Sequence, residues 1–195
     1  ALHANGYHVL GLRLPGHGTI PAGLRDVKAA DMIAAVRLAI AHMAMQPDDL
    51  PIHIAGYSTG ATLALDYTLD AMTDDNLPVP ASLVLLSPAI GVHPVAGLAS
   101  LTDTLSGVPG LGGLAWADVM PEFDPYKYNS FPTNAGDVVH KLTRSVKQRI
   151  VARARSSPAN VLPPVLAFKS AVDATVTTDA VVDNLLSLLE PDRHE

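Results

Sequence analysis

The sequence predicts an α/β fold in which a mainly parallel sheet is flanked by helices. Two observations support this. Short apolar runs alternate with amphipathic helical segments, and the runs are apolar at consecutive positions, which is typical of strands buried on both faces. Of the 195 residues, 48% are hydrophobic and 16% charged, which is enough for one sizeable core. Four strands are expected, at about 7–13, 52–56, 82–88 and 164–169.

The first ninety residues supply three of these strands and the helices between them. Residues 1–6 read as the last turn of a helix that ends at a glycine cap. The first strand runs into the turn "PGHG" (15–18), and residues 26–45 then repeat apolar side chains at helical spacing. A second helix is expected from Ala61 to about Met72, directly after the second strand.

Residues 91–160 break the alternation and are predicted to be a cap inserted at the end of the sheet, so that the core comprises 1–90 and 161–195. An apolar, aromatic-bearing cap suits an acyl pocket, the alternative being a purely structural excursion. A helix at 137–155 carries six of the 13 lysines and arginines. A solvated face is favoured for it over contact with an acidic partner or lipid headgroup. The last helix is expected at about 178–189.

The composition excludes several classes of function. A net charge of −6 argues against an extended surface for nucleic acid or anionic membrane. With no cysteine, disulfides, thiolate zinc sites and cysteine nucleophiles are excluded. No run of the sequence is long and apolar enough to span a bilayer, and no histidine pair has metal-ligand spacing. "GLGG" (110–113) lacks a dinucleotide-binding context, so no cofactor is expected. The compartment is left open, with the cytoplasm slightly favoured.

The pentapeptide Gly56-Tyr57-Ser58-Thr59-Gly60 lies between the second strand and a helix that begins with small residues. A sharp strand-to-helix turn lifts a serine hydroxyl off the sheet edge, while flanking glycines avoid clashes and the following N–H faces a developing oxyanion. The helix N-terminus adds positive potential. The pattern therefore predicts that Ser58 is a nucleophile, and the alternative is a structural loop serine.

Four stretches of the chain form a recognisable set: "GYHVLGLRLPGHGTIP" (6–21), "GYSTG" (56–60), "LVLLSPAI" (83–90) and "SAVDATV" (170–176). Together they resemble the α/β-hydrolase superfamily, in particular its esterase, lysophospholipase, monoglyceride-lipase and serine-aminopeptidase-like group. The resemblance implies Ser58 as the nucleophile, the backbone N–H of Thr59 as one oxyanion donor and Asp173 as the triad acid. Asp173 follows the last predicted strand, and its alternative role is that of a turn or capping aspartate.

The chain departs from the family pattern at both ends. Family members have further strands before the one at 7–13, and one of them ends in a His-Gly loop that supplies the second oxyanion N–H. The histidine base should follow one more strand, and His194 comes before there is room for it, so we expect the base beyond Glu195. We therefore expect the central part of a longer enzyme, with an incomplete sheet whose edges can pair with other copies. By itself it is expected to be inactive.

The predicted function is that of a serine hydrolase cleaving a carboxylic ester through an acyl-enzyme on Ser58. The resemblance implies an acyl-glycerol or lysophospholipid-like substrate. Peptidases, haloperoxidases and acyltransferases use the same triad, and the fold does not separate them. The alternative function is that of a non-catalytic scaffold that binds a partner.

Overall fold

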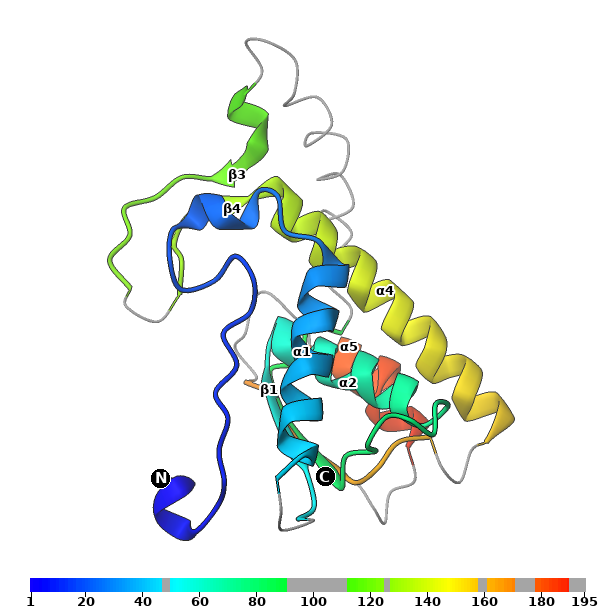
Figure 1. Cartoon of the computed structure of the whole chain (residues 1–195). Helices are drawn as coiled ribbons and strands as arrows, with labels where there is room; N and C mark the ends of the chain where they lie inside the picture. The colour runs from blue at the N-terminus through cyan, green and yellow to red at the C-terminus, as the bar shows by residue number, and fades with distance from the viewer. Residues whose placement is uncertain (47–49, 91–111, 125–126, 158–160, 171–177, 190–195) are drawn as a thin grey trace.

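The computed structural model describes residues 1–46, 50–90, 112–124, 127–157, 161–170 and 178–189 (Figure 1). Its centre is a parallel three-stranded sheet of β1 (His53–Tyr57), β2 (Ser82–Leu86) and β5 (Val165–Phe168), in the order β1-β2-β5. These strands lie where three of the four were predicted. The α/β class with a parallel sheet flanked by helices is thus confirmed.

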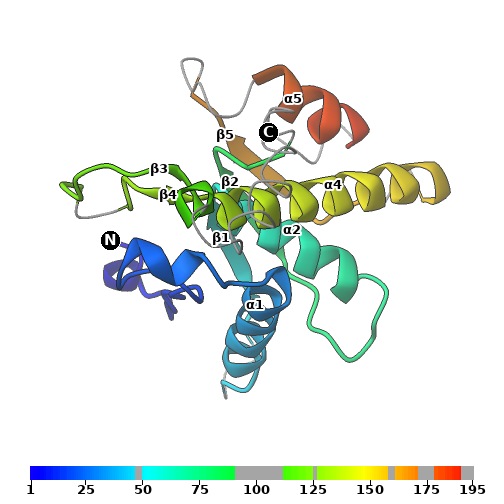
Figure 2. The same ribbon diagram turned by 90° about the horizontal axis from the view of Figure 1, so that it is seen from above.

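Four α-helices accompany the sheet in the part of the chain that the structure describes. They are α1 (Ala29–Ala44), α2 (Thr59–Ala71), α4 (Thr133–Ser156) and α5 (Thr178–Asn184). Short 3₁₀ turns lie at His3–Asn5, Pro21–Leu24, Gly112–Ala115 and Leu186–Leu188, and β3 (Trp116–Asp118) pairs antiparallel with β4 (Phe131–Pro132). Helix α2 packs against α1 and α4, and Figure 2 shows α4 between α2 and α5.

The described helices cover one face of the sheet. Leu83, Leu85 and Val165 are buried on that face. On the opposite face, Tyr57 and Phe168 are 71% and 53% exposed. The sequence predicted strands buried on both faces, and in the described residues this holds for one face only. The apolar residues of the other face are available for contact.

Residues 7–13 form no strand, so this prediction is wrong. The segment runs apart from β1, with Tyr7 54% and Val9 53% exposed (Figure 1). A strand forms only where a neighbour pairs its backbone N–H and C=O groups, and no described strand lies beside this one. The turn before it agrees with the sequence, because Gly6 caps His3–Asn5 in the left-handed region at φ 86°.

The predicted helices are confirmed with shifted ends. Helix α1 begins at Ala29 because the Asp31 carboxylate accepts the Lys28 N–H (3.3 Å) and caps the first turn.

Helix α4 begins at Thr133, four residues earlier than predicted. It follows directly after Pro132, which has no N–H to donate to a helix. The side-chain amide of Asn134 then donates to the carbonyls of Leu24 and Val27, both at 3.0 Å. Helix α5 is shorter than predicted and continues as the 3₁₀ turn at Leu186–Leu188.

An ion-pair network joins α1, α2 and α4. The Arg149 guanidinium of α4 bonds the Asp66 carboxylate (2.7 Å) and the Asp70 carboxylate, and Asp70 also pairs with Arg37 (2.6 Å). The Asp66 side chain is only 7% exposed. Burial raises the pKa of the Asp66 carboxyl above its usual value, while the charge of Arg149 lowers it. The basic helix is therefore not only a solvated face, because one of its arginines neutralises a buried carboxylate.

Replacing Arg149 with methionine is expected to destabilise the fold by about 2 kcal/mol at neutral pH, because the buried Asp66 carboxylate loses its ion-pair partner. The effect is reduced because a third of the Arg149 side chain is exposed to solvent. The change removes the charge that lowers the Asp66 pKa, so that pKa rises further. The folded state then holds the Asp66 proton more tightly than the unfolded state, and stability falls as pH rises through the raised pKa. Urea unfolding should thus show a larger loss at about pH 7 than at about pH 4. In the Asp66→Asn background, the loss of stability caused by Arg149→Met should no longer depend on pH. If it depended on pH as before, Asp66 would not be the group responsible.

Candidate active site

Ser58 occupies a strained turn between β1 and α2. Its backbone has φ 51° and ψ −117°, a region that non-glycine residues seldom adopt. Its N–H donates to the Leu86 carbonyl (2.9 Å) and so extends the sheet by one residue. Its carbonyl accepts the N–H groups of Ala61 (3.0 Å) and Thr62 (3.3 Å), which starts the helix at once. This is the sharp strand-to-helix turn expected from the sequence, and the role of Ser58 as a nucleophile stays a prediction.

The two glycines that flank the turn differ in their roles. A Cβ atom at Gly56 would lie 2.6 Å from the backbone N and Cα of Ala61, so the close approach of β1 and α2 requires glycine there. A Cβ atom at Gly60 would meet no described atom within 4 Å. The expectation that both glycines avoid clashes is therefore confirmed for Gly56 and wrong for Gly60.

The Ser58 hydroxyl and the start of α2 form an open polar site. Within the described ranges, the Ser58 Oγ has no hydrogen-bond partner, and the N–H groups of Thr59 and Gly60 have no acceptor. The first N–H groups of a helix lack intrahelical partners and carry the positive end of the helix dipole. The site can thus place a developing negative charge next to the serine oxygen. The role of the Thr59 N–H remains a prediction.

The segment that follows β2 is fastened to this turn. The Ala89 N–H donates to the Ser58 carbonyl (3.3 Å). The Ala89 carbonyl in turn accepts two buried hydroxyls, from Thr62 of α2 (3.0 Å) and Thr143 of α4 (2.7 Å). Sequence reasoning missed this arrangement. A threonine in the apolar run of α2 was the available signal, because a buried hydroxyl needs a partner.

The other predicted site residues are placed differently. Asp173 and His194 lie outside the described residues. The His17 ring has partners in its own turn and in the 91–160 segment, since Nδ1 lies 3.1 Å from the Pro15 carbonyl and the ring stacks on Tyr128 at 6.4 Å. The Tyr128 hydroxyl also accepts the Thr19 N–H (2.7 Å). These contacts give His17 a structural role.

The described residues offer no group of three histidine or acidic side chains that could hold a metal ion. None of the helices that the structure describes is long and apolar enough to cross a membrane.

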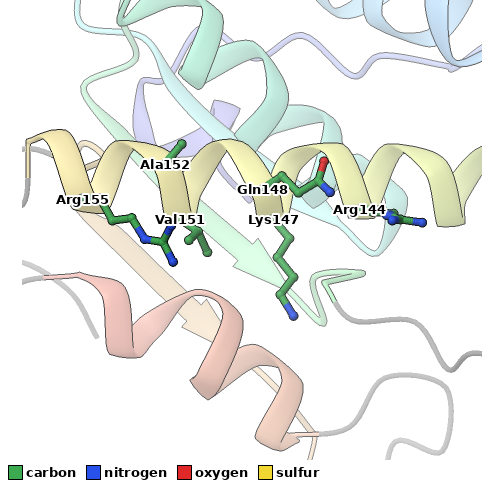
Figure 3. A pocket seen from close by; sticks show the side chains of 6 residues that line it. All are labelled: Arg144, Lys147, Gln148, Val151, Ala152 and Arg155. Carbon is green, nitrogen blue, oxygen red and sulfur yellow. The ribbon is translucent and has the colours of Figure 1, made fainter.

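A groove of about 490 Å³ lies along α4, and none of its described lining residues belongs to the Ser58 turn. Figure 3 shows its lining side chains, with Lys147 and Arg155 extending to the side of α4 on which α5 lies. The described lining comprises Arg144, Lys147, Gln148, Val151, Ala152 and Arg155. This lining is largely cationic and polar, so the groove differs from the apolar acyl pocket expected in the cap.

The chain matches one protein family over nearly its whole length. Residues 1–192 match the sequence model of the alpha/beta hydrolase family. The chain belongs to this family. A search of curated proteins found no match.

Solved structures of hydrolases resemble the chain. The structure described with LipS and LipT, two metagenome-derived lipolytic enzymes, has a TM-score of 0.68 at 18% identity, over 94% of this chain and 68% of its own. A monoacylglycerol lipase from Paleococcus ferrophilus has a TM-score of 0.56 at 16% identity, over 86% and 63%. Est1E from Butyrivibrio proteoclasticus, with ferulic acid bound, has a TM-score of 0.52 at 17% identity, over 93% and 63%. The chain thus spans about two thirds of each structure, and at these identities the likeness shows the fold.

Proposed function

We propose that the full-length protein is a serine hydrolase that cleaves carboxylic esters through an acyl-enzyme on Ser58. The observation that carries this proposal is the conformation of Ser58. Its φ of 51° at the junction of β1 and α2 is costly for a serine, and its hydroxyl makes no structural hydrogen bond within the described residues. A strained serine with an unused hydroxyl at a helix start is expected of a nucleophile rather than of a loop residue.

The proposed reaction uses a serine, a histidine and an acid in their usual roles. A histidine outside the described residues takes the Ser58 Oγ proton as Oγ attacks the ester carbonyl carbon, and Asp173 orients that histidine. The carbonyl oxygen becomes negative and is stabilised by the Thr59 N–H at the start of α2. Collapse expels the alcohol, which receives the proton from the imidazolium. Water then loses a proton to the same base, attacks the acyl-serine and releases the carboxylic acid, while the Ser58 Oγ leaves and takes the proton back from the imidazolium.

For the substrate we propose an acyl-glycerol or lysophospholipid-like ester, with residues 91–160 as the cap over the site. Support comes from the solved relatives, which include lipolytic enzymes and a monoacylglycerol lipase. The second candidate function is that of a non-catalytic binding scaffold. It is favoured by one observation, namely that no described histidine hydrogen-bonds the Ser58 hydroxyl.

A fluorophosphonate probe tests the proposal directly. The folded full-length protein should be labelled stoichiometrically, and peptide mass spectrometry should place the adduct on the peptide that contains Ser58. Heat-denatured protein is the control and should not react, because an unactivated serine is a poor nucleophile. Absence of labelling in folded protein would exclude the hydrolase and favour the scaffold. Labelling of another serine would exclude Ser58.

A further inference from the structure

We propose that Ser87 is a second serine of the site, whose hydroxyl donates a hydrogen bond to an oxygen of the ester bound at Ser58. This inference rests on the proposed function. Four observations support it: the position of Ser87 beside Ser58, its backbone conformation, the contacts that hold it there and its unused hydroxyl.

Ser87 lies next to Ser58 at the carboxyl edge of the sheet. Tyr57 of β1 pairs with Leu86 of β2, and each strand continues by one residue. The Ser58 N–H bonds the Leu86 carbonyl (2.9 Å), and the Ser87 N–H bonds the Phe168 carbonyl of β5 (2.7 Å). Neighbouring strands are about 4.8 Å apart, so a group held at Ser58 is within reach of Ser87.

The backbone of Ser87 is strained in the same way as that of Ser58. Its φ is 44°, and these two serines are the only non-glycine residues with positive φ in the described residues. Pro88 follows, and a proline further restricts the residue before it to extended conformations. Glycine would adopt this conformation without a steric penalty. A serine at this position therefore carries strain that a glycine would avoid, and strained residues of this kind are concentrated at functional sites.

The contacts of the next residues hold Ser87 in place. The Ala89 N–H bonds the Ser58 carbonyl, and the hydroxyls of Thr62 and Thr143 both bond the Ala89 carbonyl. The Ser58 turn, α2 and α4 thus fix the segment that begins at Ser87. Strain persists only where the surroundings determine a conformation in this way.

The Ser87 hydroxyl is not used by the fold. Ser87 is half-buried, and its Oγ has no hydrogen-bond partner in the part of the chain that the structure describes. The buried hydroxyls of Thr62 and Thr143 differ, since each bonds a carbonyl. The free hydroxyl beside the nucleophile therefore suits an external acceptor, and an ester offers its carbonyl and alkoxy oxygens.

Two replacements separate the hydroxyl from the strain. Ser87→Ala removes the hydroxyl and keeps the strained Cβ, whereas Ser87→Gly removes both. In the full-length protein, we expect kcat/KM for p-nitrophenyl butyrate to fall about 10-fold in each variant, as for one lost hydrogen bond. The melting temperature should be higher for Ser87→Gly than for Ser87→Ala. Equal losses of activity, together with a higher melting temperature for Ser87→Gly than for Ser87→Ala, would show that the hydroxyl acts on the substrate.

The matched control is Ser82→Ala at the other end of β2, whose hydroxyl bonds His53 (2.7 Å) and which should keep full activity. If Ser87→Gly keeps the kcat/KM of the unmodified protein, the inference is wrong while the proposed function stands. This holds even if Ser87→Ala fails to fold. If the unmodified protein is neither labelled at Ser58 nor active, both the function and this inference are overturned.

Discussion

Replacing Ser58 with alanine is expected to abolish ester hydrolysis by the full-length protein, with kcat falling on the order of 10⁶-fold. The oxygen that forms the acyl-enzyme is lost, and the N–H groups at the start of α2 supply only a residual rate. Alanine keeps the same Cβ at φ 51°, so the fold should be retained. The measurement is kcat for p-nitrophenyl butyrate, together with the melting temperature from circular dichroism.

Ser58→Gly is the matched control for the strain at this turn. It should be as inactive as the alanine variant but more stable, because glycine adopts a positive φ without a steric penalty. A nucleophile held at the expense of stability predicts this pair of results. If the alanine variant retained turnover, Ser58 would be a structural serine. If the glycine variant were the less stable of the two, the strain argument for Ser58 would fail.

The turn could be predicted from the sequence because its signals are local. Gly56 and Ser58 lie within three positions of each other, and the apolar run before them and the small residues after them set the strand and the helix. The close approach at Gly56 follows from the same short stretch. The prediction that Gly60 avoids a clash was wrong, because the pentapeptide pattern does not reveal which of its two glycines approaches a neighbouring element.

Features that depend on distant partners could not be predicted. The run at 7–13 has the composition of a strand, but pairing needs a neighbouring strand, and none lies beside it among the described residues. Asp66 and Arg149 are 83 positions apart, and nothing local marks one arginine of a basic helix as the partner of a buried carboxylate. The strain at Ser87 was likewise hidden, since "LLSPAI" reads as the end of an ordinary apolar strand.

Replacing Gly56 with alanine is expected to destabilise the protein by about 3 kcal/mol or more, at or above the upper end for overpacked cores. The new Cβ would lie 2.6 Å from the N and Cα of Ala61 and 2.7 Å from the carbonyl carbon of Gly60. These are backbone atoms of the first turn of α2, so no side-chain rotation relieves the clash and the helix start must move. Because Thr59 and Ser58 lie in that turn, fluorophosphonate labelling should slow as well. Urea unfolding and the labelling rate measure the two effects.

Gly60→Ala is the matched control, because it adds the same methyl group four residues later and meets no described atom within 4 Å. Position 60 is helical, where alanine is favoured over glycine by about 1 kcal/mol. This variant should therefore be as stable as the unmodified protein or more so, with labelling unchanged. Both variants add one methyl group, but only the one at position 56 clashes, so equal losses of stability would contradict the close approach of β1 and α2. A stable but unreactive Gly60→Ala would instead mean that substrate occupies the space beside Gly60.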